Sequence, residues 1–320
     1  TSLGSPTRLG DGNIAFLGEG TNSQSGIYAD VDGSIIKVAD RNTLIPGGTG
    51  NFSGQFYAPV SIGNGDMAFI VEDPEQPGIY AYIDGVLSVI ADRNTAIPGS
   101  TDTFAGFGLL SAIGGKDVAF YGWSSDGAGI YSYIDNVLGI VADMDTPIPG
   151  GAGNFNGFDL PVPIGEDDVA FWGFGVEQNG IFTFIDGVLE MVAINDTETP
   201  DGWGNFSSFS TPVSLGAGNL AFKANAAGEA IYRYINGRLS LVANGFYEIP
   251  GGRGEFDTFD NLVSLGEGVV GFRSTGYLQE GLYYAVNTGS ITIIKETEPD
   301  GIFRYFEFIG TDLSPMCRLH

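Results

Sequence analysis

The stretch that decides the fold is FYAPVSIGNGDMAFIVEDPEQPGIYAYIDGVLSVIADRNTAIPG, residues 56–99. Four short runs in it are rich in β-branched and aromatic residues and are bounded by Gly, Asp or Pro, as β-strands are: Phe56–Ile62, Asp66–Ile70, Gly78–Ile83 and Val86–Ala91. The last two runs are joined by Asp84-Gly85, a dipeptide that favours a type I′ hairpin because both central residues need positive φ. The stretch therefore predicts a four-stranded antiparallel sheet.

The tripeptide Gly-Ile-Tyr of this stretch recurs along the chain at a nearly constant interval. Its copies and variants begin at Gly26, Gly78, Gly129, Gly180, Ala230 and Gly281, so that successive copies are 52, 51, 51, 50 and 51 residues apart. A fixed period of this size is the signature of solenoids, propellers or repeat arrays. We therefore predict one repeat domain, residues 1–320, built from six units of about 51 residues.

The links between units are long and similar. They read ADRNTLIPGGTGNF from Ala39, ADRNTAIPGSTDTF from Ala91 and ADMDTPIPGGAGNF from Ala142. Such a link suits a chain that crosses from the outer strand of one sheet to the inner strand of the next. We predict an all-β fold, a six-bladed β-propeller of four-stranded antiparallel blades. A β-solenoid or an open repeat array is the alternative, although solenoid coils lack successive tight hairpins.

Both ends of the chain carry part of a first strand. Residues 5–10 resemble residues 58–63, and Phe303 and Phe306 repeat the paired aromatics found at Phe155 and Phe158. We expect the ring to close by pairing of the chain termini, with the C-terminal segment against the first unit, because this covers an open strand edge.

The composition limits the partners and the location. The net charge of -26 repels phosphate backbones, so nucleic acid is not an expected partner. No stretch approaches the roughly 18 apolar residues of a membrane span. Because Thr1 is not an initiator methionine, we expect a signal segment to have been removed. We therefore expect the protein to be secreted or held at the cell surface. We also expect it to be a monomer.

A short motif precedes the second strand of most units. It reads Gly12-Asn13-Ile14-Ala15-Phe16 in the first unit and Gly65-Asp66-Met67-Ala68-Phe69 in the second. With the following Gly-Ile-Tyr, the chain resembles the exported bacterial tandem-repeat proteins known by the pattern Asn-x-x-Gly-x-x-Ala-Phe. Lys116 and Asp167 replace the Gly of the pattern in two units. The resemblance implies a propeller with a cell-surface or sorting signal and transfers no catalytic residue.

Few catalytic chemistries are open to the chain. The only histidine is His320 and the only cysteine is Cys317, so a histidine-dependent triad, a multi-histidine zinc site and an internal disulfide are excluded. Hydrolysis of a glycan by two carboxylates stays open. Asp159, Asp260 and Glu307 follow the second aromatic of their first strands, where a propeller lines its central channel. They are either a catalytic set or solvated channel groups.

Aromatic residues are concentrated in the third and fourth units. Tyr121, Trp123, Trp172 and Phe174 follow the second strands there, and Trp203 lies in the next crossing loop. Exposed Trp and Tyr rings can stack on sugar faces, so these five residues are the candidate glycan site. Packing between neighbouring units is the competing interpretation.

Oxygen-bearing side chains open three crossing loops. The candidate calcium ligands are Asp40, Asn42, Asp92, Asn94, Asp143 and Asp145. Calcium takes about 6–8 oxygen ligands, but the same Asp-x-Asn-Thr pattern also forms Asx turns without an ion. We expect no required cofactor and name calcium as the candidate ion.

Taken together, these patterns predict an exported, non-enzymatic propeller that binds a glycan or an extracellular protein surface. The alternative from another class is a carboxylate-dependent glycosidase or lyase that acts on a polysaccharide at the central channel.

Overall fold

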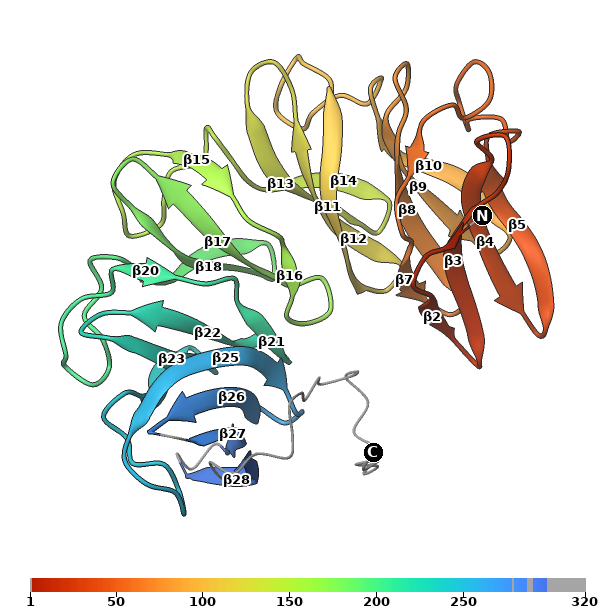
Figure 1. Ribbon diagram of the computed structural model, residues 1–320. Helices are drawn as coiled ribbons and strands as arrows, with labels where there is room; N and C mark the ends of the chain where they lie inside the picture. Colours follow the sequence, from red (N-terminus) through yellow and green to blue (C-terminus); the bar gives the residue numbers. More distant parts are fainter. Residues whose placement is uncertain (1, 278, 287–289, 298–320) are drawn as a thin grey trace.

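The computed structural model describes residues 2–277, 279–286 and 290–297. Within these residues the chain forms six antiparallel sheets, each built from consecutive strands. Figure 1 shows the sheets in chain order along an open arc, with an opening between the first sheet and the sixth. The all-β prediction is confirmed, whereas the closing segment with Phe303 and Phe306 lies outside the described residues. No helix in the described part of the chain is long and apolar enough to cross a membrane.

Consecutive strands build each of the first three sheets. The first sheet contains β1 (Ser2–Leu3), β2 (Thr7–Gly10), β3 (Asn13–Glu19), β4 (Ser25–Val31) and β5 (Ser34–Asp40). The second contains β6 (Gln55–Phe56), β7 (Val60–Gly63), β8 (Asp66–Glu72), β9 (Gly78–Ile83) and β10 (Val86–Asp92). The third contains β11 (Gly106–Gly114), β12 (Asp117–Trp123), β13 (Ala128–Ile134) and β14 (Val137–Asp143).

The remaining three sheets repeat this order. The fourth contains β15 (Phe155–Phe158), β16 (Val162–Pro163), β17 (Val169–Gly175), β18 (Asn179–Ile185) and β19 (Val188–Ile194). The fifth contains β20 (Ser208–Phe209), β21 (Val213–Gly216), β22 (Asn219–Asn225), β23 (Glu229–Ile235) and β24 (Arg238–Asn244). The sixth contains β25 (Phe256–Ser264), β26 (Val270–Gly276), β27 (Gln279–Ala285) and β28 (Ile291–Thr297).

The first strand of a unit is continuous in two sheets and broken into two pieces in the other four. The broken strands carry a proline at the break: Pro6, Pro59, Pro161 and Pro212. Proline has no N–H to donate to the neighbouring strand, so the ladder is interrupted there. Leu110 and Leu262 take the same position in the two continuous strands. The predicted single run over Phe56–Ile62 is therefore wrong in detail, since β6 and β7 are separate pieces that both pair with β8.

The predicted type I′ hairpins are confirmed. Asp84 and Gly85 have φ of 50° and 81°, and Asp32 and Gly33 have 51° and 77°. The third sheet uses Asp135 and Asn136 in the same way, with φ of 50° and 63°. Side chains support these turns, since the backbone N–H of Asp84 donates to Asp66 Oδ1 at 2.8 Å.

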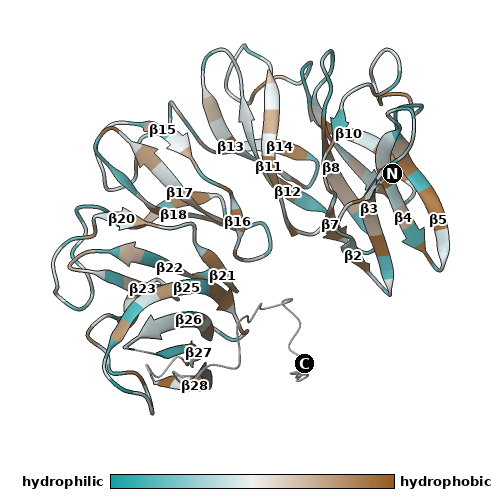
Figure 2. Cartoon of the chain, in the orientation of Figure 1, coloured by the Kyte–Doolittle hydropathy of each residue, from teal (hydrophilic) through white to brown (hydrophobic). Residues whose placement is uncertain are grey.

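The Gly-Ile-Tyr motif gives the second to fifth sheets two buried faces. Ile27 of the first sheet lies in one cluster with Phe52, Phe69 and Tyr80 of the second. Ile79 of the second sheet packs in the same way against aromatic rings of the third. Between consecutive sheets, the isoleucine of one sheet therefore faces the next sheet and the tyrosine of the next sheet faces back, so the cores lie between sheets. Figure 2 shows the apolar colour mainly on the strands, several of which also carry hydrophilic stretches.

Candidate functional site

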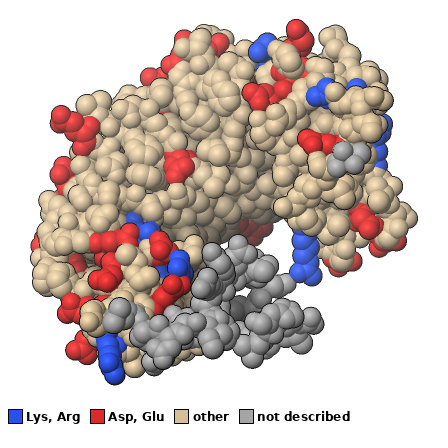
Figure 3. Space-filling view, in the orientation of Figure 1, with Lys and Arg blue, Asp and Glu red and all other residues tan. Residues whose placement is uncertain are grey.

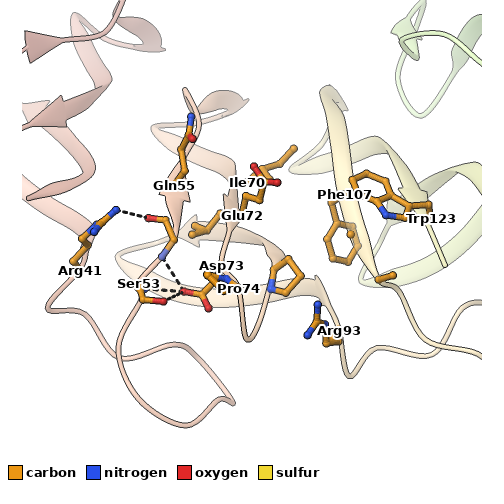
Figure 4. Close-up of a pocket in the computed structure, with 15 residues that line it drawn as sticks. Arg41, Ser53, Gln55, Ile70, Glu72, Asp73, Pro74, Arg93, Phe107 and Trp123 are labelled. Carbon is orange, nitrogen blue, oxygen red and sulfur yellow. Dashed lines mark hydrogen bonds between the residues drawn. The ribbon is translucent and has the colours of Figure 1, made fainter. Parts of the chain in front are cut away.

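A cavity of about 490 Å³ lies between the second and third sheets. Its volume is within the usual range for ligand pockets, about 300–1,000 Å³. Figure 4 shows Phe107 and Trp123 on one side and Arg41, Glu72 and Arg93 around the rest. The cavity thus combines an aromatic wall with a few charged groups, which is the arrangement that small ligands use.

Trp123 is held at the edge of this cavity by the local backbone. It ends β12, pairs with Ala128 on one side and with Gly106 on the other, and its side chain is 39% exposed. A Cβ at Gly106 would overlap the indole ring, so glycine is required where the ring lies. The position is specific to the third sheet, because Glu72 and Asn225 end the matching strands of the second and fifth sheets. The structure therefore presents one preplaced indole toward the cavity.

Two arginines supply donors from successive crossing loops. Arg41 follows β5 and its Nη2 donates to the carbonyl oxygen of Gly54 at 3.3 Å. Its Nε is buried without a hydrogen-bond partner among the described residues. Arg93 follows β10, is exposed, and makes a longer contact, 3.5 Å, with the carbonyl of Glu75. Guanidinium groups at this rim can donate to hydroxyl or carboxylate oxygens of a ligand.

The two carboxylates of the cavity have different surroundings. Asp73 is buried and accepts hydrogen bonds from Ser53 Oγ and from the backbone N–H groups of Ser53 and Gly54. Burial alone would raise the pKa of Asp73, but the hydrogen bonds from Ser53 and from the backbone N–H groups of Glu75 and Gln76 hold it below its usual value. Glu72 accepts from the Tyr57 hydroxyl at 2.7 Å, which raises the pKa of that phenol. Asp73 thus fixes the loop conformation through its hydrogen bonds, while the exposed Glu72 lines the cavity and accepts a hydrogen bond from Tyr57.

The structure separates the five predicted aromatic residues into three places. Tyr121 and Trp123 lie together on β12, with ring centroids 6.0 Å apart. Trp172 and Phe174 form a second pair on β17, and Trp172 packs against the core between the fourth and fifth sheets. Trp203 stacks on Phe246 at 4.4 Å beside a smaller cavity of about 190 Å³.

Of the predicted residues, Trp123 is the one that lines the larger cavity. Arg41, Arg93 and Glu72 were not predicted from the sequence. A signal for the arginines was present, because both occupy the same place in the ADRNT repeats, in a chain with only 13 Lys and Arg.

Two of the three predicted channel carboxylates contact the fifth sheet. Asp159, just after β15, accepts a short hydrogen bond from the Thr211 hydroxyl. Asp260, on β25, lies 3.8 Å from the Nζ of Lys223. Lys223 also pairs with Glu229 at 3.0 Å. These contacts tie the fourth and sixth sheets to the fifth, and Glu307 lies outside the described residues.

The candidate calcium ligands lie in three separate loops. Asp40 Oδ1 accepts from the Asn42 backbone N–H and the Thr43 hydroxyl, both at 2.9 Å. Asp92 and Asp143 make the same turn with the residues that follow them. The Asx turns expected from the sequence are therefore present. In the part of the chain that the structure describes, no group of three or more His, Cys, Asp or Glu side chains is placed to hold a metal ion.

An uncompensated acidic contact lies between the third and fourth sheets. Between the second and third sheets, Lys116 bridges Asp66 and Asp84, at 2.9 Å from each. Asp167 takes the place of Lys116 one unit later, beside Asp117. Asp117 is 7% exposed, and burial together with the Asp167 charge raises its pKa to about 6.

Replacing Asp167 with lysine is expected to raise stability at pH 7 by roughly 1 kcal/mol. The Asp117 carboxyl holds its proton more tightly in the folded state than in the unfolded state, because its folded-state pKa is raised. Its contribution to the free energy of unfolding is therefore complete below about pH 4 and is lost as the pH rises through about 6. The advantage of Asp167→Lys over the wild type should therefore grow between pH 4 and pH 7 in urea unfolding. The reciprocal Lys116→Asp should lose stability over the same range, and a pH-independent difference for both would refute this explanation.

Comparison with known proteins places the chain by sequence and by fold. Residues 2–287 match a family described as "Family of unknown function (DUF7453)". No curated protein matches the chain. The β-propeller domain of the Trilobed protease from Pyrococcus furiosus, described as having an open velcro topology, is 11% identical. The match has a TM-score of 0.50 and covers 91% of this chain and 82% of that one.

A second solved structure, oligopeptidase B from Leishmania major, is 12% identical with a TM-score of 0.51. The match covers 92% of this chain but 40% of that one, so this chain spans less than half of that protein. Similarity at these identities concerns the fold alone. It shows a β-propeller-like protein of repeated four-stranded sheets.

Proposed function

Since the chain belongs to the DUF7453 family, whose description assigns no activity, we propose a function from the site itself. The protein is an exported, non-enzymatic β-propeller that binds a glycan in the cavity between the second and third sheets. The observation that carries the proposal is the fixed, partly exposed Trp123 beside the donors of Arg41 and Arg93. The indole offers a flat apolar face to a sugar ring, and the guanidinium groups offer donors to its oxygens.

The charge of the protein bears on which glycan it binds. Figure 3 shows Asp and Glu scattered over the visible face, with fewer patches of Lys and Arg among them. Arg41 and Arg93 balance Glu72 and Asp73 at the cavity, against a net charge of -26 for the whole chain. A locally neutral cavity on an acidic protein favours a neutral or weakly acidic glycan over a densely sulfated one, which the overall field repels.

The proposal includes the setting of this site. We place the protein outside the cell or at its surface, as a monomer, in line with its resemblance to exported bacterial repeat proteins. We also propose that the six four-stranded units form a propeller closed by its termini. Calcium at the loops of Asp40, Asp92 and Asp143 stays a prediction. An extracellular protein surface is the other class of partner.

Replacing Trp123 with alanine is expected to weaken glycan binding at least tenfold, or about 1.4 kcal/mol. The ligand is first identified on a glycan array and its Kd is then measured by calorimetry. Trp203→Ala is the matched control, because Trp203 is also exposed but lies at the smaller cavity. Equal Kd values for the wild type and Trp123→Ala, or an equal loss in Trp203→Ala, would contradict the proposed site.

The carboxylate-dependent enzyme is the second candidate. It would require Asp159 and Asp260 to act on one bond, whereas each is engaged with the fifth sheet in a different contact. Turnover of a polysaccharide that disappears in Asp159→Asn or Asp260→Asn would raise this candidate above the first.

A further inference from the structure

We propose that the first sheet carries a socket for two phenylalanine rings, and that Phe303 and Phe306 of this chain occupy it. The inference rests on the closed ring proposed above and specifies the contact that closes it.

Five filled copies of this socket define what it holds. In the second sheet, Phe52 packs edge-on against Tyr80 at 4.9 Å and 89°, and Phe56 packs between Phe52 and Phe69. Phe52 and Phe56 are each 1% exposed. The next four sheets hold equivalent pairs, Phe104/Phe107, Phe155/Phe158, Phe206/Phe209 and Phe256/Phe259. Their first rings lie 4.8–5.0 Å from the matching Tyr or Phe. Each pair is delivered by the crossing loop that comes from the preceding sheet.

The first sheet has the walls of the socket without such a pair among the described residues. The rings of Phe16 and Tyr28 have centroids 6.1 Å apart, the same distance as those of Phe69 and Tyr80 in the second sheet. Leu3 pairs with Gly18 where Phe56 pairs with Val71, yet Leu3 is 75% exposed. A cavity of about 320 Å³ opens between Leu3, Phe16, Tyr28 and Ile35.

The apolar part of the first sheet's outer face is only large enough for two phenylalanine rings. Lower on the same face, Asp30 and Lys37 occupy the positions that Tyr82 and Val89 hold in the second sheet. Tyr82 and Val89 pack against the first sheet, whereas Lys37 pairs with Asp40. A whole apolar sheet face would leave those charged groups unsolvated. Two aromatic rings in the upper part of the face would not.

The sequence after the sixth sheet supplies the matching pair. Phe303 and Phe306 have the three-residue spacing of Phe104/Phe107 and of the three pairs that follow it. They come after β28, as each other pair comes after the last strand of the preceding sheet. The occupant is therefore the next repeat of the same element, carried by the same chain.

In the closed ring proposed above, where the sixth sheet adjoins the first, the shorter final link is long enough. In the filled copies, the N–H of the first phenylalanine donates to a carbonyl near the start of its own loop, for example Phe52 to Thr43 and Phe155 to Thr146. The residues between them, such as 44–51, form a hairpin that returns to its starting point, so they do not extend the distance that the link can span. Glu296 occupies the position in β28 that Asp40 occupies in β5. Phe303 comes seven positions after Glu296, whereas Phe52 comes twelve positions after Asp40. Without this hairpin, the three positions from Asp40 to Thr43 already bring the chain beside Phe52.

Docking also requires little rearrangement of the first sheet. Docking would displace only β1, a strand of two exposed residues that pair with Glu19 and Gly18, whereas β6 is held in its sheet by the buried Phe56. The first strand is already broken in the other proline-containing sheets, so one piece can come from each end of the chain. Phe306 would then lie opposite Gly18 and Tyr305 opposite Glu19, in the register of β6 on β8.

A disulfide reports this register directly. In a Cys317→Ser background, Glu19→Cys with Tyr305→Cys should form an intramolecular bond on mild oxidation, because directly opposed strand residues lie within disulfide range. Gln55→Cys with Glu72→Cys is the positive control, since the structure pairs these positions. Glu72→Cys with Tyr305→Cys is the negative control, since Gln55 already covers Glu72. Adding Phe303→Ala and Phe306→Ala should reduce the 19–305 bond to the level of the negative control, while adding Phe308→Ala should not.

Three outcomes would overturn the proposal: no 19–305 bond when the positive control forms, a bond only between two chains, or a bond unaffected by loss of both phenylalanines. A bond between two chains would mean that a second copy fills the socket. The assay uses no glycan, so its result is independent of the function proposed for the Trp123 cavity.

Discussion

Replacing Phe171 with alanine is expected to lower the free energy of unfolding by about 3–5 kcal/mol. Phe171 is fully buried and contacts three other rings, with centroids 5.9 Å from Phe155, 5.9 Å from Phe158 and 5.6 Å from Phe182. Its removal leaves a cavity at the contact between the third and fourth sheets. Because each sheet packs only on its neighbours, this contact is part of the continuity of the whole array. Urea unfolding measured by circular dichroism gives the difference.

The matched control is Phe16→Ala at the same repeat position of the first sheet. Phe16 is half-buried, and its ring contact is with Tyr28. In a chain whose proposed socket is emptied by Phe303→Ala and Phe306→Ala, we expect this substitution to cost less than half as much, about 1–2 kcal/mol, because no ring pair then covers Phe16. Equal losses at the two positions would mean that the cores between sheets do not provide the stability assigned to them.

The second large effect is expected from Gly180→Val, at about 3 kcal/mol or more. A Cβ at Gly180 would overlap the carbonyl oxygen of Ala193 and come within 2.7 Å of Ile194 Cγ2. The close approach arises because β19 contains a bulge beside β18, between Ile181 and Phe182 in the register. The glycine of the repeated tripeptide is therefore required by the approach of two backbones.

Ala230 is the natural exception at this position, so Ala230→Gly serves as the control. It removes one methyl group and is expected to cost less than about 1 kcal/mol. Thermal unfolding compares the two variants, and Gly180→Ala gives a milder substitution should Gly180→Val fail to fold. If Gly180→Val unfolded within a degree of the wild type, steric exclusion would not explain the repeated glycine.

Local features of the fold could be predicted from the sequence because they depend on neighbouring residues. Asp84-Gly85 specifies its hairpin through the φ values of two adjacent residues, and the 51-residue period marks the unit. The break in the first strand at Pro59 could also have been predicted, since proline lacks an N–H. It was missed because the residues on both sides of Pro59 form one apolar run. Asx turns at Asp40 depend on three successive residues and were expected for the same reason.

The candidate site could be predicted only in part, because it is assembled between units. Trp123 was selected because aromatic residues are concentrated in the third and fourth units, but its cavity needs Arg41 and Glu72 from two other units. Nothing in a linear pattern states which face of one sheet meets which loop of another. The acidic contact of Asp117 with Asp167 was hidden likewise, although the change from Lys116 to Asp167 was visible in the aligned units.

The most direct test of the proposed function is a crystal structure of the protein with the oligosaccharide that the glycan array selects. We predict a sugar ring against the indole of Trp123, between the second and third sheets and within hydrogen-bonding distance of Arg41 or Arg93. A sugar bound instead beside Asp159 or Asp260, with the Trp123 cavity empty, would contradict the proposed binding site and favour the carboxylate-dependent enzyme.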